Sequence, residues 1–152
     1  MNLYAEKASE FFNSSDKPFY LQVNYPDAHR PFIKQINGIP KKPLKVNDVT
    51  PLSFVGINHP EIRQQTADYY NSIMRLDHYV GDLLKTLEKS GSSENTIVIY
   101  IGDHGADLPR GKRTCYEGGV RIPMIIRWPK AKENQRRTRR VLRQDQRRFK
   151  IS

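Results

Sequence analysis

A run of six β-branched and aromatic residues, TIVIYI at positions 96–101, directly follows a long amphipathic pattern. An apolar run without polar alternation is typical of a strand buried on both faces of a parallel sheet. The preceding residues, 61–89, place apolar side chains at steps of three and four and predict one long helix. A helix that leads into a buried strand predicts an α/β fold with a mostly parallel central sheet flanked by helices.

Shorter patterns extend this scheme in both directions. Residues 2–13 predict a short amphipathic helix, and the sequence FYLQVNY at 19–25 predicts another buried strand. The apolar run at 124–129 predicts a further strand, whereas residues 33–60, with their prolines and glycines, predict an irregular connection.

Three single residues mark details of the long helix. We expect Asn58 to cap its N-terminus, because a side-chain amide can accept a hydrogen bond from an unpaired backbone N–H group. Gly91 is expected to end the helix, since glycine readily adopts the left-handed conformation found there. Gly81, inside the helix, predicts a close approach of another segment.

The positive charge of the chain is concentrated in one segment. Residues 130–152 hold 10 basic and 2 acidic side chains, a net +8 of the chain's total of +10. Because the remaining residues are nearly neutral, the composition argues against a basic nucleic-acid-binding fold. We expect residues 1–129 to form the folded part and residues 130–152 to be a basic tail, either disordered or encoded in a non-native frame.

Other protein classes are excluded by composition. No stretch has the ~18–20 uninterrupted apolar residues of a transmembrane helix, and the N-terminus lacks the apolar core of a secretory signal peptide. The single cysteine, Cys115, excludes an internal disulfide framework and a cysteine-rich zinc site. No base stands beside it in sequence, so we expect a small, partly buried side chain rather than a nucleophile.

Four residues are candidates for chemistry. Asp103 and His104 lie between glycines at the end of the buried strand, where paired ligand-type side chains predict a metal or anion site. Lys112, on the glycine-rich loop that follows, could contact an anionic oxygen. His29 lies in a loop between Pro26 and Pro31 and could act as a hydrogen-bond donor or general acid. Taken singly, each of these residues also fits an ordinary turn or surface position.

Together these segments resemble a known family. The sequence GDHGADLPRGKRTCYEGGVRIPMIIRWP at 102–129, the upstream YPDAHRPF and the long helix are similar to the catalytic domain of type I sulfatases. These enzymes belong to the alkaline-phosphatase-like superfamily, and the bacterial members related to heparan N-sulfatase are the most similar subgroup. The resemblance covers about residues 2–129 and implies a partial, truncated alkaline-phosphatase-like α/β sandwich.

The resemblance implies a role for each candidate. Asp103 and His104 would be two ligands of a divalent cation, usually calcium in sulfatases, while Lys112 and His29 would contact the sulfate and assist its leaving group. The reaction would be hydrolysis of sulfate esters or sulfamates in a sulfated small molecule or glycan, with no membrane or nucleic-acid partner. Family members are often periplasmic, secreted or lysosomal, and the sequence does not indicate the location of this chain.

Two features depart from the family pattern. The family's nucleophile is a formylglycine made from a Cys or Ser in the context C/S-x-P/A-x-R, which neither Cys115 nor any serine has. Calcium takes ~6–8 oxygen ligands, more than Asp103 and His104 can supply, and imidazole suits zinc-like ions better. We therefore expect an internal fragment of a sulfatase with an incomplete cation site and no turnover by itself.

Two other functions remain open on sequence grounds. His104 is compatible with a fragment of a related metal-dependent phosphodiesterase or phosphatase, because such enzymes also use an Asp-His pair. The basic tail is compatible with a non-catalytic module that binds a polyanion through salt-dependent contacts.

Overall fold

The computed structural model describes residues 3–14 and 16–129. The chain divides into two compact units, a first unit of residues 1–51 and 57–96 and a second unit of residues 52–56 and 97–152. The predicted tail at 130–152 lies outside the described residues. In the part of the chain that is described, no helix is both long and apolar enough to cross a membrane.

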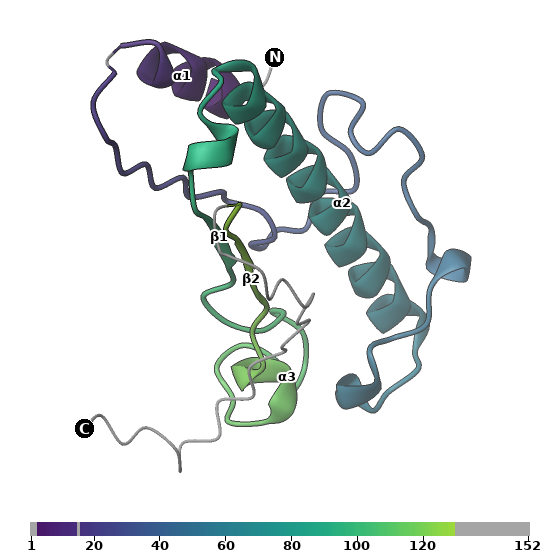
Figure 1. Cartoon of the computed structure of the whole chain (residues 1–152). Helices are drawn as coiled ribbons and strands as arrows, with labels where there is room; N and C mark the ends of the chain where they lie inside the picture. The colour runs from purple at the N-terminus through teal and green to yellow at the C-terminus, as the bar shows by residue number, and fades with distance from the viewer. Residues whose placement is uncertain (1–2, 15, 130–152) are drawn as a thin grey trace, which may run out of the picture. The chain divides into compact units, whose positions relative to one another are not determined.

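The first unit is built around one long helix, α2 (Pro60–Lys89), with the shorter α1 (Leu3–Phe12) packed beside it (Figure 1). Both helices confirm the sequence prediction. The side chain of Ala8 is buried where α1 meets its neighbours, and two 3₁₀ turns, η1 (Val46–Asp48) and η3 (Ser93–Asn95), flank the long helix in sequence.

The predicted C-terminal end of α2 is confirmed, whereas the predicted N-cap is wrong. His59, not Asn58, is the N-cap, and its Nδ1 accepts a hydrogen bond from the backbone N–H of Glu61 at 3.4 Å. Gly91 follows the last turn with φ +77°, as predicted, and its N–H donates to the carbonyl oxygen of Glu88 at 3.0 Å. The expected close approach at Gly81 is wrong, because a Cβ there would meet no atom within 4 Å.

The strand predicted at 19–25 is not formed. The segment is extended, and its side chains alternate between half-buried and exposed, but no ladder of backbone hydrogen bonds joins it to another described segment. On its outer side, the hydroxyl of Tyr20 donates to Gln22 at 3.1 Å, and Gln22 donates to Asn24 at 3.2 Å. An apolar, β-rich sequence therefore produces the extended backbone, while a strand also requires a paired neighbour.

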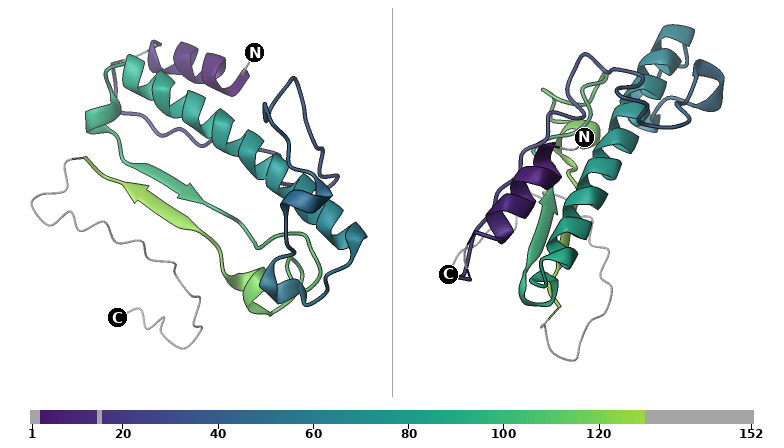
Figure 2. Two further views of the ribbon diagram at one scale, coloured as in Figure 1. Left: turned by 90° about the vertical axis from the view of Figure 1, so that its right-hand side faces the viewer. Right: turned by 90° about the horizontal axis from the view of Figure 1, so that it is seen from above.

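The second unit contains a two-stranded sheet of β1 (Val98–Ile101) and β2 (Met124–Arg127). The strands are antiparallel, with Ile99 opposite Ile126, and run side by side in Figure 2. The expected mostly parallel arrangement is thus not what these two strands show. Between them lie only loops and one helical turn, α3 (Glu117–Val120), whereas the crossover that joins two parallel strands is usually a longer α-helix packed on the sheet.

The prediction that residues 96–101 are buried on both faces is also wrong. Exposure alternates along β1, and Ile99 and Ile101 remain 56% and 58% exposed. Two strands without a covering layer leave one face of the sheet open, so the apolar sequence indicates a strand but not its burial.

Candidate functional site

Asp103 and His104 lie immediately after β1, as predicted, and their side chains converge. Nε2 of His104 is 3.2 Å from Oδ2 of Asp103. Nδ1 of the same imidazole is 2.8 Å from the carbonyl oxygen of Gly105. Because a carbonyl can only accept, Nδ1 carries the proton of this hydrogen bond, which leaves Nε2 as the atom that faces the carboxylate.

This pairing attracts positive charge. A neutral imidazole presents a lone pair at Nε2, and a lone pair facing a carboxylate is repelled unless a proton or a cation lies between them. The two atoms therefore fit a shared cation as part of a ligand set. Within residues 3–14 and 16–129, no group of three or more His, Cys, Asp or Glu side chains could hold a metal ion, so the pair supplies only part of such a site.

The loop that follows is closed by main-chain hydrogen bonds. The N–H of Gly105 donates to the carbonyl oxygen of Gly119 at 3.0 Å, and the N–H of Lys112 donates to that of Ala106 at 2.7 Å. A Cβ on Gly105 would overlap the carbonyl oxygen of Gly118, so only glycine fits this crossing. The backbone thereby holds Lys112 on the same loop that begins with Asp103 and His104.

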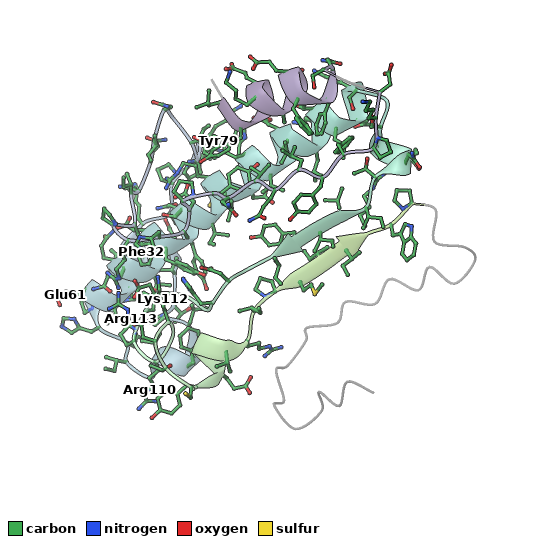
Figure 3. All side chains as sticks on the ribbon, turned by 90° about the vertical axis from the view of Figure 1, so that its left-hand side faces the viewer. Phe32, Glu61, Tyr79, Arg110, Lys112 and Arg113 are labelled. Carbon is green, nitrogen blue, oxygen red and sulfur yellow. The ribbon has the colours of Figure 1, made fainter. Side chains whose placement is uncertain are left out.

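Lys112 lies between two residues with unusual backbone geometry. Arg110 and Arg113 have φ values of +59° and +70°, a left-handed conformation that costs a non-glycine residue about 1–3 kcal/mol. The three basic side chains are labelled in Figure 3. The ammonium of Lys112 takes part in no hydrogen bond or ion pair with another described residue, and the side chain is half-buried. It is therefore available to an anion.

His29 lies in the first unit, on the loop that follows the extended segment. Its imidazole is exposed, and Nδ1 donates to the carbonyl oxygen of Arg30 at 2.7 Å. As in His104, the carbonyl of the next residue in sequence selects the Nδ1–H form and leaves Nε2 open. His29 belongs to the first unit, whereas Asp103, His104 and Lys112 belong to the second.

Sequence reasoning missed two residues beside His29 and misjudged Cys115. Asp27 and Arg75 form a buried ion pair beneath the histidine loop, and the signal was available only in part, as an acidic residue two positions before the histidine. Cys115 is exposed rather than partly buried and lies in the irregular segment that leads into α3. Its thiol makes no hydrogen bond with another described residue.

The chain belongs to the sulfatase family, since the model of the sulfatase domain matches residues 1–146. An ulvan-active sulfatase from Formosa agariphila is 50% identical over 68 residues, 45% of this chain and 11% of the relative. Human N-sulphoglucosamine sulphohydrolase is 26% identical over 132 residues, 75% of this chain and 26% of the relative. The chain thus spans between about a tenth and a quarter of the length of these relatives.

A solved structure supports the same assignment. The crystal structure of yidJ from Bacteroides fragilis, a protein whose sulfatase function is itself a prediction, matches with a TM-score of 0.59 and 27% identity. The match covers 84% of this chain and 30% of that chain. The predicted α/β class of the alkaline-phosphatase-like type is confirmed by this likeness, with a small, truncated sheet.

Proposed function

We propose that this chain supplies the sulfate-contacting side chains and part of the cation site of an enzyme that hydrolyses sulfate esters or sulfamates. The observation that carries the proposal is the convergence of Asp103 and His104 at the start of a hydrogen-bonded glycine loop, in a chain of the sulfatase family. The family assignment favours this function over phosphoester hydrolysis.

Sulfatases generally use a divalent metal ion, which, when bound, polarises a sulfate oxygen and stabilises the charge that builds up during cleavage. Oδ2 of Asp103 and Nε2 of His104 are the atoms of this chain that would hold it. We propose calcium as the ion. A zinc-like ion is the alternative, because imidazole is a better ligand for zinc than for calcium.

Lys112 and His29 would act on the anion itself. The ammonium of Lys112 is a compact charge that can bind a sulfate oxygen and lower the cost of negative charge on the leaving oxygen. The open Nε2 of His29, when protonated, can donate to a sulfate oxygen or to the leaving group. Neither Nζ of Lys112 nor Nε2 of His29 makes a hydrogen bond or ion pair with another described residue.

No attacking group is assigned to this chain. Family members use formylglycine, made in a C/S-x-P/A-x-R context, but Glu117 and Gly119 stand where Cys115 would require Pro or Ala and Arg. The chain is therefore proposed to bind sulfate without turnover. The substrate class is a sulfated small molecule or glycan, the chemistry that the names of its relatives share.

A titration with inorganic sulfate in the presence of Ca²⁺ tests the proposal. We expect the chain to bind sulfate and Lys112→Ala to weaken the binding by at least about tenfold, the equivalent of ~1.4 kcal/mol. Lys42→Ala, which removes an exposed lysine of the first unit, is the matched control and should bind like the unchanged chain. Equal affinity of the two variants would remove Lys112 from the site.

A further inference from the structure

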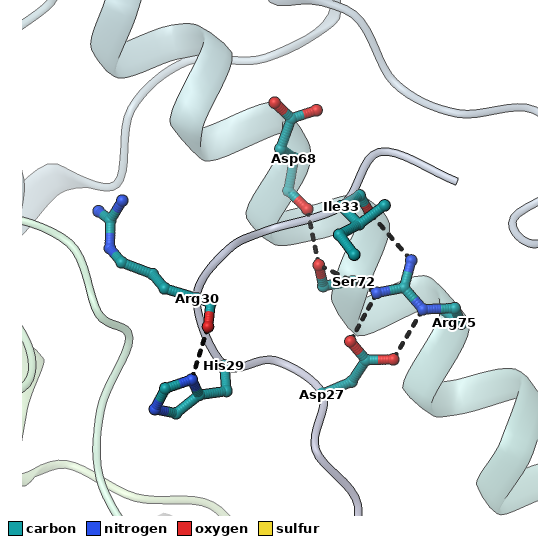
Figure 4. A network of polar contacts seen from close by, with 7 residues as sticks. All are labelled: Asp27, His29, Arg30, Ile33, Asp68, Ser72 and Arg75. Atoms are coloured by element: carbon teal, nitrogen blue, oxygen red, sulfur yellow. Dashed lines mark hydrogen bonds and ion pairs between the residues drawn. The ribbon is translucent and has the colours of Figure 1, made fainter. Parts of the chain in front are cut away.

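The loop that carries His29 is fastened at both of its ends by one side chain, Arg75 of α2. Nε of Arg75 donates to Oδ2 of Asp27 at 2.7 Å, and Nη2 donates to Oδ1 at 2.5 Å, so the pair is bidentate. Nη1 donates to the carbonyl oxygen of Ile33 at 2.9 Å. Figure 4 shows this guanidinium bridging the segment before the histidine and the segment after it.

The bridging pair is buried, although His29 itself is exposed. The side chains of Arg75 and Asp27 are only 2% and 14% exposed. Ser72, one turn earlier on α2, accepts a weaker hydrogen bond from Nη2 at 3.4 Å and donates to the carbonyl oxygen of Asp68 at 3.0 Å. Each nitrogen of this planar guanidinium therefore donates to at least one acceptor, an arrangement that a lysine in the same place could not reproduce.

Additional contacts place the rest of the loop on the same helix. Nη2 of Arg30 donates to Oε1 of Gln65 at 3.0 Å, and the rings of Phe32 and Tyr69 pack edge to face at a centroid distance of 5.3 Å. The guanidinium of Arg30 also lies 4.8 Å from the centre of the Phe32 ring. These contacts hold Arg30, whose carbonyl oxygen accepts the Nδ1–H of His29.

We propose that Arg75 is a positioning residue for His29. By fixing Asp27 and Ile33, it holds the Arg30 carbonyl where it selects the Nδ1–H form of the imidazole and points Nε2 into solvent, toward an incoming anion. This inference rests on the proposed role of His29 in sulfate binding, whereas the effect of Arg75 on the ring of His29 can be measured without any anion.

The experiment follows the ring nitrogens of His29 by NMR in the full chain labelled with ¹⁵N-histidine. Arg75→Lys keeps the charge but removes the fork, and the double variant Asp27→Ala with Arg75→Met removes both charges without leaving either one buried and unpaired. Arg63→Lys is the matched control, because it makes the same substitution on the same helix and Nε of Arg63 has no hydrogen-bond partner. Helix content by circular dichroism shows whether α2 remains folded.

We expect the unchanged chain and Arg63→Lys to show His29 with the proton on Nδ1. Both Arg75 variants should show averaged Nδ1–H and Nε2–H forms for His29 while His104 and the helix content stay unchanged. Retention of the Nδ1–H signature in both Arg75 variants would overturn the proposal. If the single variant loses helix content, the double variant decides whether Arg75 orients the ring of His29. A parallel change at His104 in the double variant would show a general loss of structure and would contradict a positioning role.

A second arm adds inorganic sulfate. If His29 responds to sulfate, Arg75→Lys should weaken that response by about 10- to 100-fold, the usual effect of removing a group that orients a ligand. An unchanged affinity would contradict the functional part of the inference. If His29 of the unchanged chain shows no response, the proposed sulfate contact of His29 fails, while the first arm still decides whether Arg75 orients the ring.

Discussion

Nε2 of His104 lies 3.2 Å from Oδ2 of Asp103, and Nδ1 of the same ring donates to the carbonyl oxygen of Gly105. The carbonyl fixes which nitrogen is open, and the carboxylate places negative charge in front of it. Histidines that bind metals commonly donate the other ring N–H to a carbonyl or carboxylate in the same way.

Removing this pair should weaken cation binding. We expect the double variant Asp103→Asn with His104→Ala to lose at least about tenfold in affinity for Ca²⁺ or Zn²⁺, ~1.4 kcal/mol, in calorimetric titrations. His78 and Asp82 on α2 offer a matched control, since their Nε2–Oδ2 distance is 3.5 Å. Loss of binding on removing His78 and Asp82 instead would place the ion on the helix.

Two glycine-to-alanine substitutions, one at Gly105 in the glycine loop and one at Gly81 in α2, should change stability in opposite directions. In Gly105→Ala the new Cβ overlaps the Gly118 carbonyl, so the free energy of unfolding should fall by about 1–3 kcal/mol or more. In Gly81→Ala the new Cβ lies inside a helix and meets no atom within 4 Å. The free energy of unfolding should therefore rise by roughly 0.5–1 kcal/mol. Urea unfolding measures both, and a tolerated Gly105→Ala would mean that the loop is not closed as described.

The first unit should lose stability at high pH through Tyr25. Burial raises the pKa of this phenol to about 12 from its ordinary 10.0, with smaller contributions from Tyr4 and Asp82. Because the folded state holds the proton more tightly, the stabilisation is complete below pH 10.0 and is lost as the pH rises toward about 12.

Urea unfolding between these pH values provides the measurement. Tyr25→Phe should show a smaller loss of stability across this range than the unchanged chain. Tyr20→Phe, which removes the hydroxyl of a side chain that is 82% exposed, should follow the unchanged chain. The same steep loss in Tyr25→Phe would show that another group is responsible.

The open face of the sheet predicts self-association. Ile99 and Ile126 are opposite each other on β1 and β2 and are 56% and 54% exposed. Exposed apolar side chains gathered on one face of a small sheet favour contact between chains. We expect Ile99→Lys with Ile126→Lys to shift sedimentation toward the monomer, whereas Gln22→Lys, which adds charge elsewhere, should not. A monomeric unchanged chain would contradict this prediction.

The sequence was sufficient for elements whose pattern is local. The 30-residue helix α2 follows from a periodicity sustained over many turns, and β1 and β2 follow from runs of β-branched residues. Strand pairing was not predictable, because residues 19–25 have the same character as β1 but no partner among the described residues. Propensity describes one segment, while a sheet depends on two.

In the candidate site, too, some residues could be recognised from the sequence and others only from the packing. Asp103, His104 and Lys112 were recognisable because glycines and a strand end surround them in sequence. Arg75 was not, because a single arginine in a helical pattern normally lies in solvent, and only the packing of the histidine loop onto α2 buries it. Its partner, Asp27, is 48 positions away.

We propose that this chain binds a sulfate group but carries no group that attacks it. The most direct test incubates the purified chain and Ca²⁺ with an aryl sulfate and follows binding and release of the phenol in the same sample. We expect the aryl sulfate to bind and to be displaced by inorganic sulfate, with no phenol released above the level of Lys112→Ala. Release above that level, or no binding at all, would contradict this proposal.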